Sequence, residues 1–175
     1  MMRKLNFLLL SVFTLIFIQA CESETEETGD TQPTMREAET PPQSQLDIDI
    51  EIIQDYMRNE GMVGDRTATG LHYVLHEQGE GERAVPGKTV EVHYTGYLLD
   101  GTVFDSSHER NQPIDFVLGQ GMVIQGWDEG IALLKEGGSA TLLIPSDLAY
   151  GPRGAGDVIP PNAVLRFDVE LISVQ

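Results

Sequence analysis

Apolar and polar residues alternate at every second position through much of the second half of the chain. The alternation is clearest at 71–76, 90–95 and 165–171, where Leu, Val, Tyr or Phe occupies one of the two sets of positions. Successive side chains on a strand point to opposite faces, so this pattern is typical of strands with one buried face. Such strands predict an antiparallel sheet that is solvated on one side.

One short segment between these strands has helical spacing instead. Trp127, Ile131 and Leu134 fall at i, i+4 and i+7, and Gly137-Gly138 follows as a stop signal. The spacing predicts a single helix of about two to three turns. We therefore expect an α+β fold in which one face of an antiparallel sheet packs on one short helix.

A second helix is expected at the start of the folded part. Within 46–60 the large apolar side chains recur at helical spacing, and Asn59-Glu60-Gly61 supplies a stop. These apolar positions are Ile48, Ile52, Ile53, Tyr56 and Met57. A short amphipathic helix of this kind can dock on the globule or pair with a second copy of the chain; docking is the simpler arrangement.

The N-terminus has the pattern of an export signal. After a short basic start, 5–20 holds twelve apolar residues in sixteen. This run is shorter than the roughly 20 apolar residues of a membrane-spanning helix, and acidic residues follow it, which favours a secretory signal peptide over 1–20. Ile18-Gln19-Ala20-Cys21 resembles a bacterial lipobox, in which the cysteine is lipidated before cleavage. We expect a lipidated Cys21; the alternative is a soluble exported protein with an incidental cysteine.

Charge and cysteine usage exclude several classes of protein. The 175 residues include 28 acids and 11 bases, for a formal net charge of −17, which argues against nucleic-acid binding because that requires clustered Lys and Arg. Cys21 is the only cysteine, so an intrachain disulfide, a Cys-rich zinc site and an iron–sulfur cluster are excluded. Segment 21–45 is rich in Glu, Thr, Pro and Gln and is expected to be a flexible acidic tether. Its first acids are either a sorting signal or part of that tether.

Motifs of common enzyme chemistry are absent from the sequence. There is no GxSxG elbow, no GxxxxGK[ST] loop and no HExxH zinc motif. Asp105-Ser106-Ser107-His108 holds the residue types of a hydrolase triad, but adjacent residues on a turn seldom converge in the order that mechanism needs. His72 and His76 are four apart, which suits a metal on a helix but not on a strand, so two exposed histidines are expected. No metal and no cofactor is predicted, and catalysis would depend on the shape of an apolar pocket.

Three segments mark such a pocket. Segment 92–107 reads VHYTGYLLDGTVFDSS, 116–134 reads FVLGQGMVIQGWDEGIALL and 145–162 reads PSDLAYGPRGAGDVIPPN. The last is a long Gly- and Pro-rich loop, and loops of that length in a compact domain are usually functional. In these phrases the chain resembles, over 70–175, the FK506-binding family of peptidyl-prolyl cis–trans isomerases.

The resemblance implies a twisted antiparallel sheet of five or six strands wrapped on one short helix. It also implies a pocket with Trp127 as its floor, on which the substrate proline would rest. The implied apolar walls are Tyr94, Phe104, Val123, Ile124 and Phe167. The predicted organisation is a signal peptide over 1–20, a tether over 21–45, the amphipathic helix and a linker over 46–69, and the isomerase domain over 70–175.

The polar residues of the implied site are few. Asp105 matches a carboxylate beside the reacting amide, and Arg110 matches a basic partner that steadies it. Tyr150 matches a hydroxyl that bonds a substrate carbonyl, and the backbone N–H of Ile124 matches a second donor.

An overhanging loop is also implied, with Ile159 in it and Val158 beside it. Two positions depart from the pattern, Ile114 where an aromatic wall is frequent and Ala155 where a histidine is frequent. Both lie at the rim, so they bear on substrate preference and macrolide affinity.

Three functional classes follow from these features. The first is a lipid-anchored prolyl isomerase that acts on X–Pro segments of unfolded or exported proteins in the bacterial cell envelope, at the periplasmic face, in the outer membrane or at the surface. Macrolides such as FK506 or rapamycin are the inhibitors that the resemblance implies. The second is a peptide-binding module or holdase with incidental isomerase activity, and the third is a structural lipoprotein with a vestigial pocket. The intact set of pocket residues favours the first class over the third.

Overall fold

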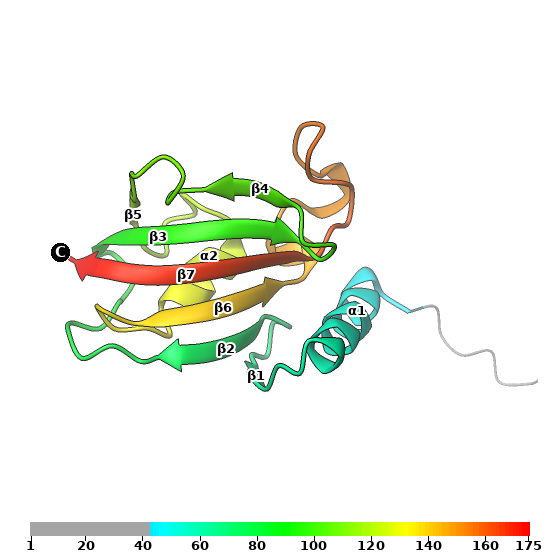
Figure 1. Cartoon of the computed structure of the whole chain (residues 1–175), viewed down its shortest axis with the longest axis horizontal. Helices are drawn as coiled ribbons and strands as arrows, with labels where there is room; N and C mark the ends of the chain where they lie inside the picture. Colours follow the sequence, from blue (N-terminus) through cyan, green and yellow to red (C-terminus); the bar gives the residue numbers. More distant parts are fainter. Residues whose placement is uncertain (1–42) are drawn as a thin grey trace, which may run out of the picture. The chain divides into compact units, whose positions relative to one another are not determined.

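The computed structural model describes residues 43–175, so the predicted signal peptide, Cys21 and nearly all of the tether lie outside it. One sheet has the strand order β1-β2-β6-β7-β3-β4, and β5 also pairs with β3 (Figure 1). The strands, antiparallel in every pairing, are β1 (Asp65–Arg66), β2 (His72–Glu77), β3 (Thr89–Leu98), β4 (Val103–Ser106), β5 (Ile114–Val117), β6 (Ser139–Ile144) and β7 (Leu165–Val174). The α+β class is confirmed. The sheet has seven strands rather than five or six because it includes β1, whose two residues are both exposed and carry no alternation.

Helix α2 (Gln125–Ile131) packs on one face of the sheet and shares its main core with strands β3, β6 and β7. Two glycines allow this close approach. A Cβ on Gly126 would lie 2.4 Å from Cγ2 of Ile144, and a Cβ on Gly130 would lie 2.5 Å from Cδ1 of Leu142. Any larger residue at either position would push the helix away from β6.

Helix α2 ends before Leu134, the last position of the apolar spacing that predicted it. The N–H groups of Leu133 and Leu134 bond to the carbonyls of Gly130 and Ile131 at 3.2 and 3.0 Å, so the chain tightens into a turn after Ile131. Leu134 is nevertheless fully buried, and its carbonyl accepts from the N–H of Ala84 at 3.2 Å. The spacing therefore identified the buried positions, and the seven-residue helix has about two turns, the lower end of the predicted length.

Helix α1 (Gln45–Asn59) docks on the domain, which is the simpler of the two arrangements open from the sequence. Its Ile53 and Met57 form a second apolar cluster with Leu143 of β6 and Val164. Leu143 alternates with the core residues of β6, so this cluster lies on the face of the sheet opposite α2. The sheet is therefore covered in part on both faces, not on one.

The buried face of α1 also differs from the predicted one. Ile48 and Ile52 are 38% and 42% exposed, whereas Asp49, Ile53 and Met57 are buried. A capping box of Ser44 and Asp47 begins the helix.

His72 contradicts the expectation of two exposed histidines. It is 5% exposed, and its Nδ1 lies 3.0 Å from the carbonyl oxygen of Gly70. The reason is that α1 covers this side of β2, where His72 shares a hollow with Met57. Burial lowers the pKa of the His72 imidazole, because desolvation disfavours its charged form. His76 is exposed as expected, with Nε2 2.9 Å from Oγ1 of Thr141.

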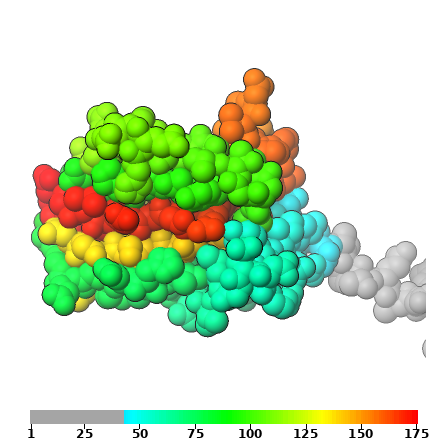
Figure 2. Space-filling model, in the orientation of Figure 1, coloured from blue at the N-terminus to red at the C-terminus, as the bar shows by residue number. Residues whose placement is uncertain are grey.

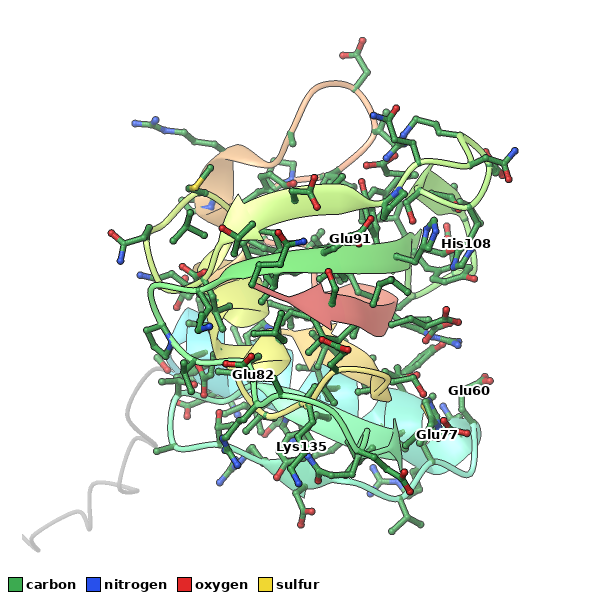
Figure 3. The ribbon with its side chains drawn as sticks, turned by 90° about the vertical axis from the view of Figure 1, so that its left-hand side faces the viewer. Glu60, Glu77, Glu82, Glu91, His108 and Lys135 are labelled. Carbon is green, nitrogen blue, oxygen red and sulfur yellow. The ribbon has the colours of Figure 1, made fainter. Side chains whose placement is uncertain are left out.

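The surface combines a projecting loop with dispersed acids. Part of the Gly- and Pro-rich segment 145–162, drawn in orange, stands out from the body of the domain (Figure 2), whereas Ser146 and Ile159 of the same segment are buried. The labelled Glu60, Glu77, Glu82 and Glu91 project from separate parts of the ribbon (Figure 3). Among residues 43–175, no helix has both the length and the apolar character needed to cross a membrane.

Candidate active site

The candidate active site is a pocket of about 210 Å³ bounded by strands β3, β4, β5 and β7, the start of α2, and Tyr150. Its walls are mostly aromatic and branched aliphatic side chains. They are Tyr94, Phe104, Asp105, Ile114, Met122, Val123, Ile124, Trp127, Tyr150 and Phe167. Eight of these ten are residues that the sequence predicted for the site. Residues more than 70 positions apart are thus brought to one hollow.

Trp127 lies at the bottom of the pocket and is 3% exposed. The ring of Tyr94 meets it edge-on, with centroids 4.9 Å apart and planes at 83°, and Phe167 does so at 5.3 Å and 87°. Edge-to-face contacts of this kind are the favoured geometry for aromatic pairs. The buried Nε1–H of Trp127 has no hydrogen-bond partner among the described residues. The floor is therefore buried, packed by aromatic rings and apolar, apart from one unpaired donor.

A glycine on β3 makes room for the aromatic wall. A Cβ on Gly96 would lie 2.6 Å from Cζ of Phe104 and 2.8 Å from Cε1 of Phe167. The two phenyl rings meet edge-on over this glycine, with centroids 5.4 Å apart. Any side chain at 96 would displace both rings, so the VHYTG motif has a steric reason for its glycine.

A carboxylate, a phenol and a guanidinium form the polar side of the pocket. Asp105 accepts hydrogen bonds from the hydroxyl of Tyr94 and from Nη1 of Arg110, and Nη2 of Arg110 donates to the Tyr94 hydroxyl at 3.0 Å. Desolvation by itself would raise the pKa of Asp105, but these two hydrogen bonds and the charge of Arg110 outweigh it, so that pKa lies below its ordinary value. Asp105 is therefore a fixed negative charge at neutral pH and not a proton donor.

Two further donors belong to the pocket. Tyr150 lines it with a side chain that is 40% exposed, and burial followed by the charge of Asp105 raises the pKa of its hydroxyl. Ile124 precedes α2 in an extended conformation, and its carbonyl accepts from the N–H groups of Trp127 and Asp128. Within residues 43–175 no hydrogen bond engages the N–H of Ile124. Both donors can therefore bond a bound peptide.

The loop before α2 contains a pocket residue that the sequence reasoning missed. Met122 lines the pocket with a side chain that is 62% exposed, and its sulfur accepts from the N–H of Val117 at 3.4 Å. The carboxylate of Asp128 holds the loop by accepting from the N–H groups of Gly119 and Gly121 at 2.8 and 3.0 Å. The acid in the first turn of the predicted helix was the available signal, since such residues often bond preceding backbone N–H groups.

Three predicted substrate-binding residues lie outside the pocket lining. Arg110 contacts the site only through Asp105 and Tyr94. Ile159 is 7% exposed and packs in the main core, whereas Val158 is 51% exposed. Reciprocal backbone hydrogen bonds of 2.9 and 3.0 Å join Ala155 to Ile159, and the residues between them, Val158 included, form the tip of the projecting loop.

The alternative chemistries have no geometry to support them. Ser107 is buried, with its Oγ accepting from the N–H of Tyr94 at 2.7 Å, and His108 stacks on His93 with ring centroids 4.5 Å apart. Ser107 Oγ also lies 2.9 Å from Nδ1 of His93, and no side-chain hydrogen bond joins Asp105, Ser107 and His108, so these three form no triad. Within the described part of the chain, no group of three or more His, Cys, Asp or Glu side chains is placed to hold a metal ion.

Comparisons with known proteins agree with this geometry. Residues 80–172 match the family described as FKBP-type peptidyl-prolyl cis-trans isomerase. The chain is 57% identical over 98 residues to the FK506-binding protein of Neisseria meningitidis serogroup A, covering 56% of this chain and 90% of that protein. It is 55% identical over 108 residues to the probable FKBP-type isomerase FkpA of Neisseria meningitidis serogroup B, covering 62% of this chain but only 39% of the relative.

Solved structures show the same fold. The structure of FkpA from Escherichia coli matches with a TM-score of 0.65 and 41% identity, over 73% of this chain and 58% of the other. AtFKBP13 matches with a TM-score of 0.61 and 41% identity, over 65% of this chain and 99% of the other. The chain thus spans less than two thirds of the longer FkpA proteins. The matched segment and the shared fold make this chain a member of the FKBP-type peptidyl-prolyl cis-trans isomerase family.

Proposed function

We propose that the isomerase reaction takes place in the aromatic pocket over Trp127, on X–Pro segments of unfolded or exported proteins in the bacterial cell envelope. In this proposal the chain is held at a membrane by a lipidated Cys21. The observation that carries the assignment of the site is the combination of edge-on aromatic walls with two free hydrogen-bond donors, those of Tyr150 and Ile124.

The pocket suits a reaction that needs no proton transfer. An X–Pro amide is planar through resonance, and rotation about its C–N bond costs about 18–20 kcal/mol. The planar amide is more charge-separated than the twisted one, so the apolar walls of Phe104 and Phe167 stabilise it less than water does. In this mechanism the proline ring rests on Trp127. The apolar walls disfavour the planar amide more than the twisted one, which lowers the barrier to rotation.

The polar groups fix the chain on either side of the rotating bond. The hydroxyl of Tyr150 and the N–H of Ile124 donate to carbonyls of the bound peptide, so that one side is held while the other turns. Asp105 stays ionised because of Tyr94 and Arg110, and it lies beside the amide as a fixed charge. No step of this mechanism uses a metal or a cofactor.

The rim gives the pocket a ligand preference of its own. Relatives bear the name FK506-binding protein, which supports binding of FK506-like macrolides by this chain as well. Ile114 and Met122 line the pocket with apolar, non-aromatic side chains, and Ala155 places only a methyl group at its position in the projecting loop. These positions are where macrolide affinity and substrate preference would differ from those of the relatives.

Anchoring is supported by the sequence around Cys21. An apolar leader ends at a small residue followed by this single cysteine, and acidic residues come next. One acyl chain binds a membrane only marginally, whereas two or more chains hold stably. Full lipoprotein maturation at Cys21 would therefore keep the folded domain at the membrane on an acidic tether.

Isomerisation of a chromogenic X–Pro peptide by the purified full chain in detergent tests the catalytic proposal. We expect acceleration over the uncatalysed rate and competitive inhibition by FK506. A rate unchanged by the protein would contradict it. Suppression of protein aggregation that survives Asp105→Ala would instead favour the alternative function, a peptide-binding holdase.

Membrane fractionation with radiolabelled palmitate tests the anchor. The wild-type chain is expected to incorporate label and sediment with membranes, and Cys21→Ser is expected to do neither. Ser23→Ala, two residues away, is the matched control and should behave as wild type. Unlabelled, processed wild-type protein in the soluble fraction would rule out lipidation.

A further inference from the structure

Helix α1 carries a buried carboxylate that points into the isomerase domain. Asp49 is fully buried, although acids are seldom buried without partners. Its Oδ2 accepts from the backbone N–H of Ser146 at 2.7 Å and from the Ser146 hydroxyl at 2.6 Å, and its Oδ1 accepts from Nε2 of Gln45 at 2.7 Å. All three donors are neutral. The helix lies outside residues 80–172, the segment that matches the family.

Ser146 begins the short turn that leads from β6 to Tyr150. This turn, η1 (Ser146–Leu148), is closed by a 2.9 Å hydrogen bond from the N–H of Ala149 to the carbonyl of Ser146. Tyr150 comes directly after Ala149. The place where Asp49 holds the backbone is therefore only four residues before the pocket hydroxyl.

The surroundings make this contact tight. Ser146 is itself fully buried, and α1 packs directly on η1. A Cβ on Gly70 would lie 2.8 Å from Cδ1 of Leu46 on α1 and 3.6 Å from Cγ of Pro145, just before Ser146. In Figure 1, α1 lies near the end of β6 from which this segment departs. The start of the turn is thus enclosed between α1 and the segment around Gly70.

We propose that Asp49 is a positioning residue for catalysis: by holding Ser146, it orders the η1 turn and so places the hydroxyl of Tyr150 in the pocket. The inference rests on the proposed function of Tyr150. It gives α1 a role in the reaction in addition to its apolar docking through Ile53. The Tyr150 hydroxyl makes no hydrogen bond to any of residues 43–175, so the backbone that carries it and the walls of the pocket set its position.

The two substitutions at Asp49 have different consequences. Asp49→Ala leaves the N–H and hydroxyl of Ser146 buried without an acceptor, so the turn is expected to loosen. Asp49→Asn keeps one oxygen that can accept both bonds and should preserve the turn. Asp55→Ala is the matched control, because Asp55 is an exposed acid on the same helix whose partner is Arg58 and not η1.

Amide hydrogen exchange on the full chain in detergent reads the turn directly. In Asp49→Ala the peptide over 146–151 should exchange at least tenfold faster, while β3 and β7 keep their protection. Asp49→Asn should restore slow exchange, and Asp55→Ala should leave 146–151 unchanged. Unaltered exchange over 146–151 in Asp49→Ala would overturn the inference, whatever happens to turnover.

Turnover then tests the link to Tyr150. At a temperature well below the melting temperature of the variant, Asp49→Ala is expected to lower kcat/KM three- to tenfold. Asp49→Asn should have a kcat/KM close to that of the wild type. In a Tyr150→Phe background the effect of Asp49→Ala should largely vanish, since the group being positioned is gone. An equal loss in both backgrounds would refute positioning through Tyr150. If Tyr150→Phe alone left kcat/KM unchanged, the proposed role of Tyr150 would be wrong. The exchange data would still show whether Asp49 orders the turn.

Discussion

The two faces of the central strands β3 and β7 carry opposite kinds of side chain. Toward α2 they present Tyr94 and Phe167, which line the pocket. Toward the other face they present Arg166 and Asp168, whose side chains are joined by a hydrogen bond of 2.8 Å. The two kinds of side chain alternate along the same two ten-residue strands.

Polar side chains are paired on the α1 face, whereas the pocket face leaves two N–H donors free. On the α1 side Asp168 also accepts from the hydroxyl of Thr141 at 2.6 Å, and Arg166 donates to the Tyr56 hydroxyl at 3.2 Å. In the pocket, the N–H of Ile124 and the indole N–H of Trp127 have no partner among the described residues. Unpaired buried donors cost stability, so the pocket face is suited to a ligand and the opposite face to holding the fold together.

Replacing an aromatic side chain on each face with alanine should give the largest difference in turnover between the two faces. Phe104→Ala is expected to lower kcat/KM at least tenfold and the free energy of unfolding by about 1–3 kcal/mol, because it removes a wall and leaves an open cavity. Tyr97, on the other face of β3 with Arg166 stacked 5.1 Å from its ring centroid, is the control. Tyr97→Ala should cost about 1 kcal/mol and leave turnover unchanged. Equal turnover losses in both would show that the pocket is not the site.

A pair of carboxylates tests the same contrast with a smaller change. Asp105→Ala should reduce kcat/KM about tenfold and cost less than about 1 kcal/mol, since Asp105 is partly exposed. Asp168→Ala should leave kcat/KM nearly unchanged. It should lower the free energy of unfolding by about 1–3 kcal/mol, because Arg166 is left half-buried without its partner. Paired chemical unfolding and peptide isomerisation measure both. Full turnover in Asp105→Ala would remove it from the site.

The pH profile of turnover should be nearly flat. The pKa of Asp105 lies below its ordinary 3.8, and burial raises the pKa of Tyr94 and Tyr150 above 10, so none of the three titrates at neutral pH. We expect kcat/KM to vary less than about twofold between pH 6 and 8. The lowered pKa of Asp105 stabilises the folded state at pH values above the pKa of this carboxyl in the unfolded chain. The stabilisation is lost as the pH falls through the pKa of Asp105 in the folded state. A bell-shaped profile near neutrality would point to a different mechanism.

The smallest expected effect concerns stability in mild acid. Burial lowers the pKa of His72 from 6.5, so the unfolded chain takes up its proton first as the pH falls. Stability should therefore decrease below about pH 6.5 and continue to do so down to the folded pKa. His72→Gln should remove this slope, and His76→Gln, at the exposed position on β2, should retain it. Chemical unfolding at several pH values between 5 and 8 gives the comparison.

The sequence was sufficient for features that depend on local repetition. Alternation at 90–95 and 165–171 predicted two strands because the pleat of a strand imposes a period of two. The phrases around Trp127 and Asp105 identified most of the pocket wall, because the order of these motifs along the chain resembles that of a known family. Those predictions required no knowledge of which segments touch.

Long-range burial was decided only by the tertiary structure. Asp49 and Ser146 are 97 positions apart, and neither the acid on a polar helix face nor the serine in a loop signals the other. The pattern of β2 predicts an exposed His72, but α1 covers this side of the strand. Met122 lines the pocket on a loop whose backbone N–H groups bond to Asp128. Local periodicity follows from backbone geometry, which neighbouring residues share. Whether a polar group is buried depends on which distant surface packs against it, and that is set by the packing of the whole domain.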